Sequence, residues 1–273
     1  MSATRTVLSG LEFPEGLRWH NGRLWFSDMN ACKVISVDLE GNQENVCDMP
    51  GPCSGLGWLP DGTLLVVSML DRRLLCMDKD GLSLVADLKG LATYHCNDMV
   101  VDRQGRAYVG HFGFDLSRGE APKPADIVMV TPDGKARVVA DQLAFPNGTV
   151  ITPDGKTLIV AETYGACLTA FDILADGSLS GRRNWATFNG AVPDGICLDK
   201  DGGIWAASPI SKEVIRVVEG GEVTARHGFA HSAYACMLGG VKRQTLFVAT
   251  SGIEAASGCI EALEVDVPGA GWP

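Results

Sequence analysis

The sequence lacks any apolar segment that could cross a membrane. Among its 273 residues, no run approaches the ~18 consecutive apolar residues that a transmembrane helix needs. The first residues, MSATRTVLSGLEF, also lack the apolar core of a signal peptide. We therefore expect a cytoplasmic protein that does not act at membranes.

Basic residues are scarce relative to acidic ones. The chain has 23 Lys and Arg against 33 Asp and Glu, and its formal net charge is −10. The acidic residues are scattered along the chain, so the surface as a whole repels nucleic acid phosphates and anionic lipid headgroups. This argues against nucleic acid and membranes as partners. We expect a small-molecule partner and a monomer or small homo-oligomer.

Two signatures of cysteine and serine chemistry are also missing. The nine cysteines are odd in number and no two have C-x-x-C spacing, so we expect buried free thiols rather than a disulfide or zinc framework. No G-x-S-x-G sequence is present, which argues against a serine nucleophile. Among the cysteines, Cys96 is the candidate for a role at the site, because it directly precedes the candidate site residue Asn97.

What the sequence does have is a repeat rich in turn residues, with 33 Gly and 13 Pro in the chain. One frame occurs six times: a key residue, followed by Gly in four copies, then a short apolar run, a turn, and a second apolar run. FPEG, FPNG and VPDG are three of its starting points. The key residues are Glu15, Ser54, Asn97, Asn147, Asp194 and Ala235, separated by 39, 43, 50, 47 and 41 residues.

Each frame continues into a second hairpin, so one unit has about four strands. Six such units predict an all-β fold, a six-bladed β-propeller with four-stranded blades, which residues 1–273 form as a single domain. The last unit is one strand short, and the β-prone stretch ATRTVLSG (3–10) has no other partner. We expect this N-terminal strand to complete the last blade and close the ring.

The repeat predicts where the key residues lie. The first strand of each propeller blade lines the central channel, so the key residues form a ring at one mouth of it. Glu15, Asn147 and Asp194 then bring two carboxylates and an amide oxygen together, a donor set that suits one hard divalent cation. Oxygen donors favour Ca and also suit Mg or Mn, while Zn and Fe stay open. The alternative is a polar, water-filled channel without a metal.

Several motifs together resemble a known family. FPEG, HCND, FPNG-x-x-x-TPDG, LIVAET and PDGICLD-x-x-G-x-IW occur in this order between about Leu11 and Phe247. They are similar to the gluconolactonase, senescence marker protein and luciferin-regenerating enzyme family. The resemblance implies a six-bladed propeller with one catalytic divalent metal at the channel mouth. It also implies hydrolysis of a lactone, such as a sugar lactone or a related small one.

The resemblance also assigns residues by motif. The metal ligands of the family fall on Glu15, Asn147 and Asp194, and an Asn that helps to hold the substrate falls on Asn97. His95 stands where sugar lactonases of the family often carry an Arg. An imidazole offers fewer donors than a guanidinium, which suits a different or less polar lactone.

The segment 111–126 is an insertion relative to the other units, and its aromatic, Gly and Pro residues predict a lid or pocket wall. At its start, His111 in GHFGFDL is a candidate substrate contact. Phe112, Phe114 and Tyr94 are candidates for an apolar wall.

These observations lead to the hypothesis of a metal-dependent lactone hydrolase. The cation polarises the carbonyl, and Asp194 acts as the general base for water, or the cation itself lowers the pKa of that water. One alternative keeps the metal site but hydrolyses other esters or organophosphates. Another is a non-catalytic propeller scaffold that binds proteins, which the acidic ring disfavours.

Overall fold

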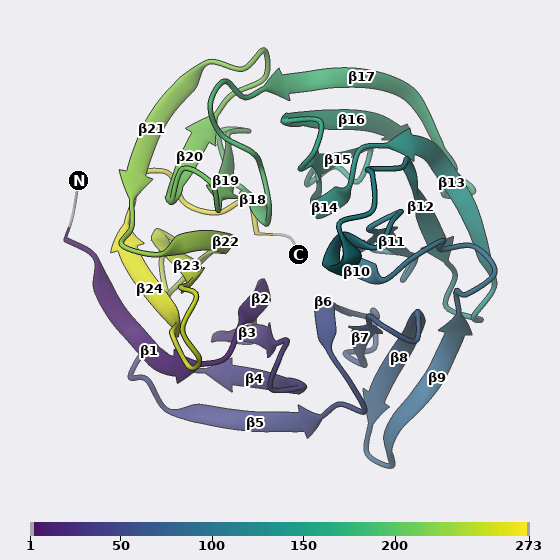
Figure 1. Ribbon diagram of the computed structural model, residues 1–273, viewed down its shortest axis with the longest axis horizontal. Coiled ribbons are helices and arrows are strands. Elements are labelled where there is room, and N and C mark those ends of the chain that lie inside the picture. The colour runs from purple at the N-terminus through teal and green to yellow at the C-terminus, as the bar shows by residue number, and fades with distance from the viewer. Residues whose placement is uncertain (1–2, 272–273) are drawn as a thin grey trace.

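Six antiparallel sheets of four strands each surround a central channel in the computed structural model, which describes residues 3–271 (Figure 1). In five of the sheets, four strands consecutive in sequence lie side by side, with the first strand nearest the channel. The predicted six-bladed propeller and its four-stranded blades are confirmed.

The blades follow the order of the sequence. Blade one holds β2 (Pro14–His20), β3 (Arg23–Asp28), β4 (Lys33–Val37) and β5 (Gln43–Asp48). Blade two holds β6 (Cys53–Trp58), β7 (Leu64–Ser68), β8 (Arg73–Asp78) and β9 (Gly81–Asp87). Blade three holds β10 (Cys96–Val101), β11 (Ala107–His111), β12 (Ala125–Val130) and β13 (Ala136–Leu143).

The second half repeats the arrangement. Blade four holds β14 (Pro146–Ile151), β15 (Thr157–Glu162), β16 (Cys167–Ile173) and β17 (Leu179–Thr187). Blade five holds β18 (Ile196–Leu198), β19 (Ile204–Ser208), β20 (Glu213–Val217) and β21 (Val223–Gly228). Blade six holds β22 (Ser232–Gly239), β23 (Thr245–Ser251), β24 (Gly258–Glu264) and β1 (Arg5–Leu11).

The N-terminal strand closes the ring, as predicted. β1 pairs antiparallel with β24, from Arg5 opposite Ala262 to Leu11 opposite Gly258, and Figure 1 shows the two ends of the colour scale side by side in this blade. The first and last parts of the chain therefore share backbone hydrogen bonds, and β24 has no open edge.

Burial falls from the channel to the rim. Every residue of β10 and β14 is buried, whereas most residues of β5 and β21 are exposed or only partly buried. The core lies between neighbouring blades, where side chains of adjacent sheets interlock. For example, Trp19 of blade one stacks on Phe247 of blade six with ring centroids 5.6 Å apart. This gradient explains why the inner strands read as nearly continuous apolar runs.

The glycine after a key residue lets neighbouring blades approach near the channel. A Cβ atom added at Gly148 would lie 2.5 Å from the backbone nitrogen of Ile196 in the next blade. One added at Gly195 would lie 2.7 Å from the Cα atom of Ala235, also one blade further on. No side chain fits at such distances, so these positions must be glycine for the first strands of neighbouring blades to lie this close together.

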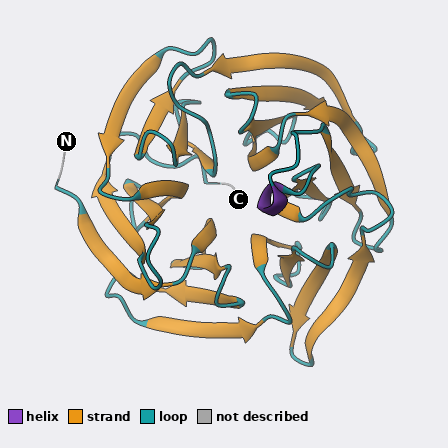
Figure 2. Cartoon of the chain, viewed as in Figure 1, coloured by secondary structure: helices purple, strands orange, loops and turns teal. Residues whose placement is uncertain are grey.

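Other expectations concern cysteine and helix. All nine cysteines are free, and five of them are buried, as expected for small apolar side chains. Within residues 3–271 the only helix is the short 3₁₀ helix η1 (Leu116–Arg118), drawn in purple in Figure 2. No helix in this part of the chain has the length and apolar character that spanning a membrane requires.

Replacing Gly148 by Ala tests the close approach of the blades. We expect Gly148→Ala to lower the free energy of unfolding by about 1–3 kcal/mol, because the atoms in the way belong to the backbone and cannot swing aside. Urea unfolding of the metal-free protein measures the change. Gly90→Ala is the matched control, since a Cβ there meets no atom within 4 Å. An equal effect of both substitutions would contradict the proposed tight contact.

Candidate functional site

The key residues of four blades meet at one end of the channel. Glu15 lies on β2, Asn97 on β10 and Asn147 on β14, while Asp194 lies just before β18. All four line one cavity of about 610 Å³, together with Ser54 of β6. The repeat therefore brings together residues that are up to 179 positions apart, from Glu15 to Asp194. These residues form the floor of the cavity, and we call them the ring.

A buried ion pair lies next to the ring. Arg18 of β2 donates a hydrogen bond to Asp98 of β10 at 2.7 Å, and both side chains are almost fully buried. Arg18 also donates to the carbonyl oxygens of Leu17 and Met99. Arg18 and Asp98 therefore form a buried salt bridge between blades one and three.

The two carboxylates of the ring have no such partner. In the described part of the chain, neither Glu15 nor Asp194 forms a salt bridge with a basic side chain. The backbone N–H of Gly16 donates to Glu15 Oε2 at 2.9 Å, whereas Asp194 Oδ1 is buried without a hydrogen-bond partner. Two acidic groups thus share a poorly solvated space without a direct salt bridge, and the nearby charge of Arg18 only partly offsets the burial of Glu15.

The pKa values reflect this imbalance. Burial, together with the nearby charge of Asp194, raises the pKa of Glu15 well above its usual value. Burial is also the main cause that raises the pKa of Asp194 to about 8, and the charge of Asp98 adds to it. Both groups would ionise far more readily beside a bound cation, which is the condition expected of a metal site.

The donor set of the ring fits a hard divalent cation. Among residues 3–271, no cluster of three or more His, Cys, Asp or Glu side chains could hold a metal, so a site here needs the Asn147 amide as its third ligand. Asn147 Nδ2 donates to Thr163 Oγ1 at 3.2 Å, and Thr163 Oγ1 donates onward to the carbonyl oxygen of Pro193 at 2.8 Å. This chain of hydrogen bonds occupies the amide nitrogen and leaves the amide oxygen of Asn147 available as a ligand.

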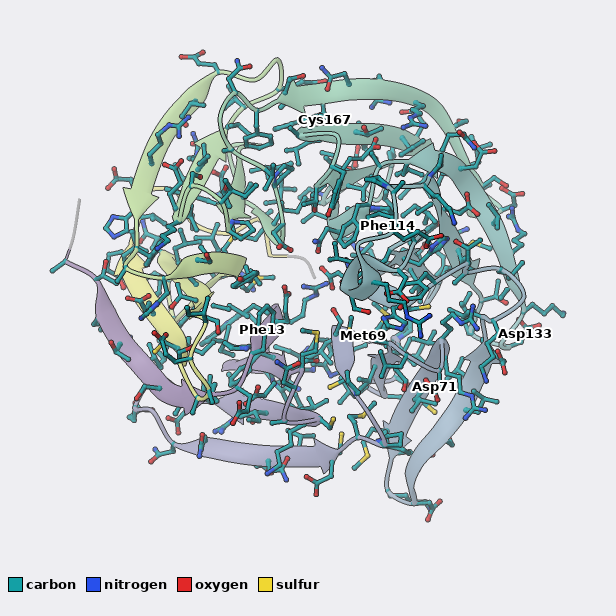
Figure 3. All side chains as sticks on the ribbon, in the orientation of Figure 1. Phe13, Met69, Asp71, Phe114, Asp133 and Cys167 are labelled. Atoms are coloured by element: carbon teal, nitrogen blue, oxygen red, sulfur yellow. The ribbon has the colours of Figure 1, made fainter. Side chains whose placement is uncertain are left out.

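The side of the cavity consists of loops that follow the second strands of five blades. Apart from Thr163, the side chains that these loops add to the lining are apolar or aromatic. We call this set the apolar wall: Met29, Met69, Phe112, Leu116, Tyr164 and Ile210. Figure 3 labels Met69 on one side of the channel and, on a neighbouring blade, Phe13, which also lines the cavity.

The insertion of blade three supplies part of this wall. Phe112 stacks on Phe145 with ring centroids 4.5 Å apart, and Leu116 belongs to η1. Phe114 does not line the cavity; it is buried behind the wall, against the rings of Phe145 and Tyr164. The remaining wall candidate, Tyr94, is also absent from the lining.

Neither candidate histidine lines the cavity. His111 is fully buried, its Nε2 accepts the backbone N–H of Asp126 at 3.0 Å, and burial lowers its pKa to about 4. His95 lies with its ring 4.0 Å from that of Tyr94 and 6.0 Å from that of Phe112, and burial lowers its pKa as well. His95 thus packs beside Phe112 of the wall, and substrate contact through either histidine stays a prediction.

Some cavity residues were not identified from the sequence. Phe13, Phe145 and Val192 line the cavity, and each stands two positions before a key residue, in FPEG, FPNG and VPDG. The repeat frame therefore carried a signal for them. The buried ion pair of Arg18, beside the cavity, could not be identified from the sequence either, because a single Arg within an apolar strand does not reveal its partner in another blade.

The propeller and its ring define a class: six-bladed propellers with an acidic, oxygen-rich site at one mouth of the channel. The chain belongs to the family described as the SMP-30/Gluconolactonase/LRE-like region, which it matches over residues 13–252. The resemblance seen in the sequence motifs is thereby confirmed.

Two relatives are similar over most of their length. Pentonolactonase XacC of Haloferax volcanii is 23% identical over 262 residues, covering 92% of this chain and 86% of the relative. The 6-deoxy-6-sulfogluconolactonase of Pseudomonas putida is 24% identical over 267 residues, covering 92% and 89%. Among solved structures, a gluconolactonase from Xanthomonas campestris has a TM-score of 0.79 and 25% identity, covering 98% and 90% of the two chains.

The raised pKa of Asp194 predicts a pH-dependent loss of stability in the metal-free protein. In the folded chain Asp194 keeps its proton up to about pH 8, whereas in the unfolded chain it loses it near pH 3.9. The folded state thus binds more protons between these values, so this group makes the free energy of unfolding fall as the pH rises. Urea unfolding between pH 5 and 8, with a chelator present, measures the slope.

Asp194→Asn is the comparison that isolates this effect. The histidines with lowered pKa act with the opposite sign, but they do so in both proteins. We expect the variant to become more stable relative to the wild type as the pH rises from 5 to 8. A difference in the free energy of unfolding between the two proteins that stays constant from pH 5 to 8 would contradict the raised pKa of Asp194.

Proposed function

We propose that this protein hydrolyses lactones with one divalent cation held by Glu15, Asn147 and Asp194. The observation that carries the proposal is the pair of acidic side chains at the floor of a cavity, close together and without a basic partner in the described chain. The family and the names of its relatives, a pentonolactonase and two gluconolactonase-type enzymes, supply the reaction class. Carboxylate and amide oxygens favour calcium among the possible cations.

A cation held by Glu15, Asn147 and Asp194 would supply a positive charge that polarises the lactone carbonyl and stabilises the negative charge developing on its oxygen. Of the two acidic side chains, Asp194 is better placed as the general base. The Asp194 carboxyl group accepts hydrogen bonds from the side chain of Asn147 and the N–H of Gly195, but its Oδ1 has no donor, whereas Glu15 Oε2 is occupied by the N–H of Gly16. The backbone holds Asp194 in place, because its N–H donates to the carbonyl oxygen of Ala207 at 2.9 Å.

A single residue, Asp194, can then both accept and return the proton. Asp194 Oδ1 accepts a proton from water as the water oxygen attacks the carbonyl carbon. When the ring C–O bond breaks, the same proton passes from Asp194 to the ring oxygen, which becomes the hydroxyl of the hydroxy acid product. Asn97 lines the same floor and its side chain donates to the carbonyl oxygen of Pro146 at 3.3 Å, so its amide oxygen is left to position the substrate or the water.

Removal of the cation is the first test. We expect hydrolysis of γ-butyrolactone and of a pentono-1,4-lactone to stop after treatment with a chelator and to return on adding back one cation, with calcium restoring the most activity. A pH-stat or a pH indicator measures the acid released. Full activity in the chelator, with less than an equivalent of metal by elemental analysis, would rule out the proposed role of the ring.

Two matched substitutions separate the base from a plain metal ligand. Asp194→Asn and Glu15→Gln each remove one carboxylate charge, so both should weaken cation binding. At saturating cation, Glu15→Gln should keep most of its kcat, whereas Asp194→Asn should lose about 10²–10⁴-fold, the usual contribution of a general base. Equal kcat values for the two variants at saturating cation would show that Asp194 is not the base.

A further inference from the structure

The apolar wall limits what the cavity can recognise. Of the residues that line it, only Glu15 and Asp194 are charged and only Asn97 and Asn147 carry amides, and all four belong to the ring. The loops of five blades add no charged and no amide side chain to the lining. Above the floor, hydroxyl groups are therefore the only polar side-chain groups.

Two of these hydroxyls, on Thr163 and Tyr234, already have hydrogen-bond partners, and Tyr164 carries a third. Thr163 Oγ1 already donates to Pro193 and accepts from Asn147. The hydroxyl of Tyr234 has Ser232 as a hydrogen-bond partner. A polyhydroxylated ring placed against this wall would leave several of its own hydroxyls facing carbon, and each unpaired hydroxyl costs binding free energy.

The rim of the cavity is apolar as well. Tyr164 is 48% exposed, Leu116 44% and Ile210 73%, although all three line the cavity. Single exposed apolar side chains are common on proteins, but these three come from three different blades and face one opening. An apolar group that reaches the mouth would cover them and remove their surface from water.

We infer that the substrate is a lactone with an apolar substituent, an alkyl chain or an aromatic ring, rather than a sugar lactone. This rests on the proposed function, in that the carbonyl of the lactone binds at the ring. The substituent then lies along Phe112, Phe145 and Tyr164 and leaves through the rim. The relatives named for sugar lactones are only 23% and 24% identical to this chain. At this distance the wall residues can differ between the proteins while the ring residues stay the same.

A homologous series of substrates tests the preference. We expect kcat/KM to rise by up to about fourfold for each methylene that enters the wall. From γ-butyrolactone to γ-octalactone, the rise should be on the order of 10²-fold. A pentono-1,4-lactone should fall below γ-hexalactone. A series with no rise, or a pentonolactone with the highest kcat/KM, would overturn the inference.

Binding without turnover separates this inference from the proposed function. γ-Lactams with ethyl to hexyl side chains resist hydrolysis, and titration calorimetry should show tighter binding and a more negative heat-capacity change with each methylene. If these lactams bind in order of chain length but no lactone is hydrolysed with any cation, the proposed function is wrong and the apolar preference stands. If lactones are hydrolysed while lactam affinity is independent of chain length, the inference is wrong.

Variants at the rim locate the preference in the wall. Leu116→Gln and Ile210→Gln replace exposed side chains, so both proteins should fold. We expect each to reduce the gain in lactam affinity per methylene for the longer chains. Val241→Gln is the matched control, because Val241 is 93% exposed in the turn between β22 and β23, at the opposite end of the blade. If the rim variants behave like the control, the alkyl chain of the lactam binds elsewhere and the inference is wrong.

Discussion

The close approach of Glu15 and Asp194 is the constraint on which the rest of the site depends. Two carboxylates in a poorly solvated space repel each other, and neither gains a basic partner in the described chain. Nearby, Asp98 does have a basic partner in the same channel, because it forms a salt bridge with Arg18. The contrast between a carboxylate with a salt bridge and two without one indicates that Glu15 and Asp194 serve what they bind and not stability.

The fold imposes this approach through its narrow centre. Six first strands must share the channel, and glycine at positions such as 148 and 195 removes the side chain that would hold neighbouring blades apart. Where a blade departs from this rule, as with Asp98 after Asn97, the larger side chain enters the channel and is paired by Arg18. Backbone geometry and charge arrangement at the floor therefore have one origin, the repeated frame that starts each blade.

The same frame explains which features could be predicted from the sequence. Strand number, blade order, ring closure and the meeting of Glu15, Asn97, Asn147 and Asp194 all follow from a pattern that recurs along the chain. The pairing of Arg18 with Asp98 could not be predicted, because it joins single residues 80 positions apart in blades that are not neighbours. The burial of His111 and its absence from the cavity lining could not be predicted either, because sequence proximity to the ring does not show which way a side chain faces.

Floor and wall differ in how freely they can change. The floor stands on buried strands whose glycines touch the next blade, so almost any substitution there disturbs the packing as well as the chemistry. The wall stands on loops, and several of its side chains are partly exposed, so its polarity can change at little cost to the fold. One reaction class can therefore persist across distant relatives while the preferred lactone changes, because the two properties reside in structural parts with separate tolerances. An apolar wall above an acidic floor is one outcome of that separation.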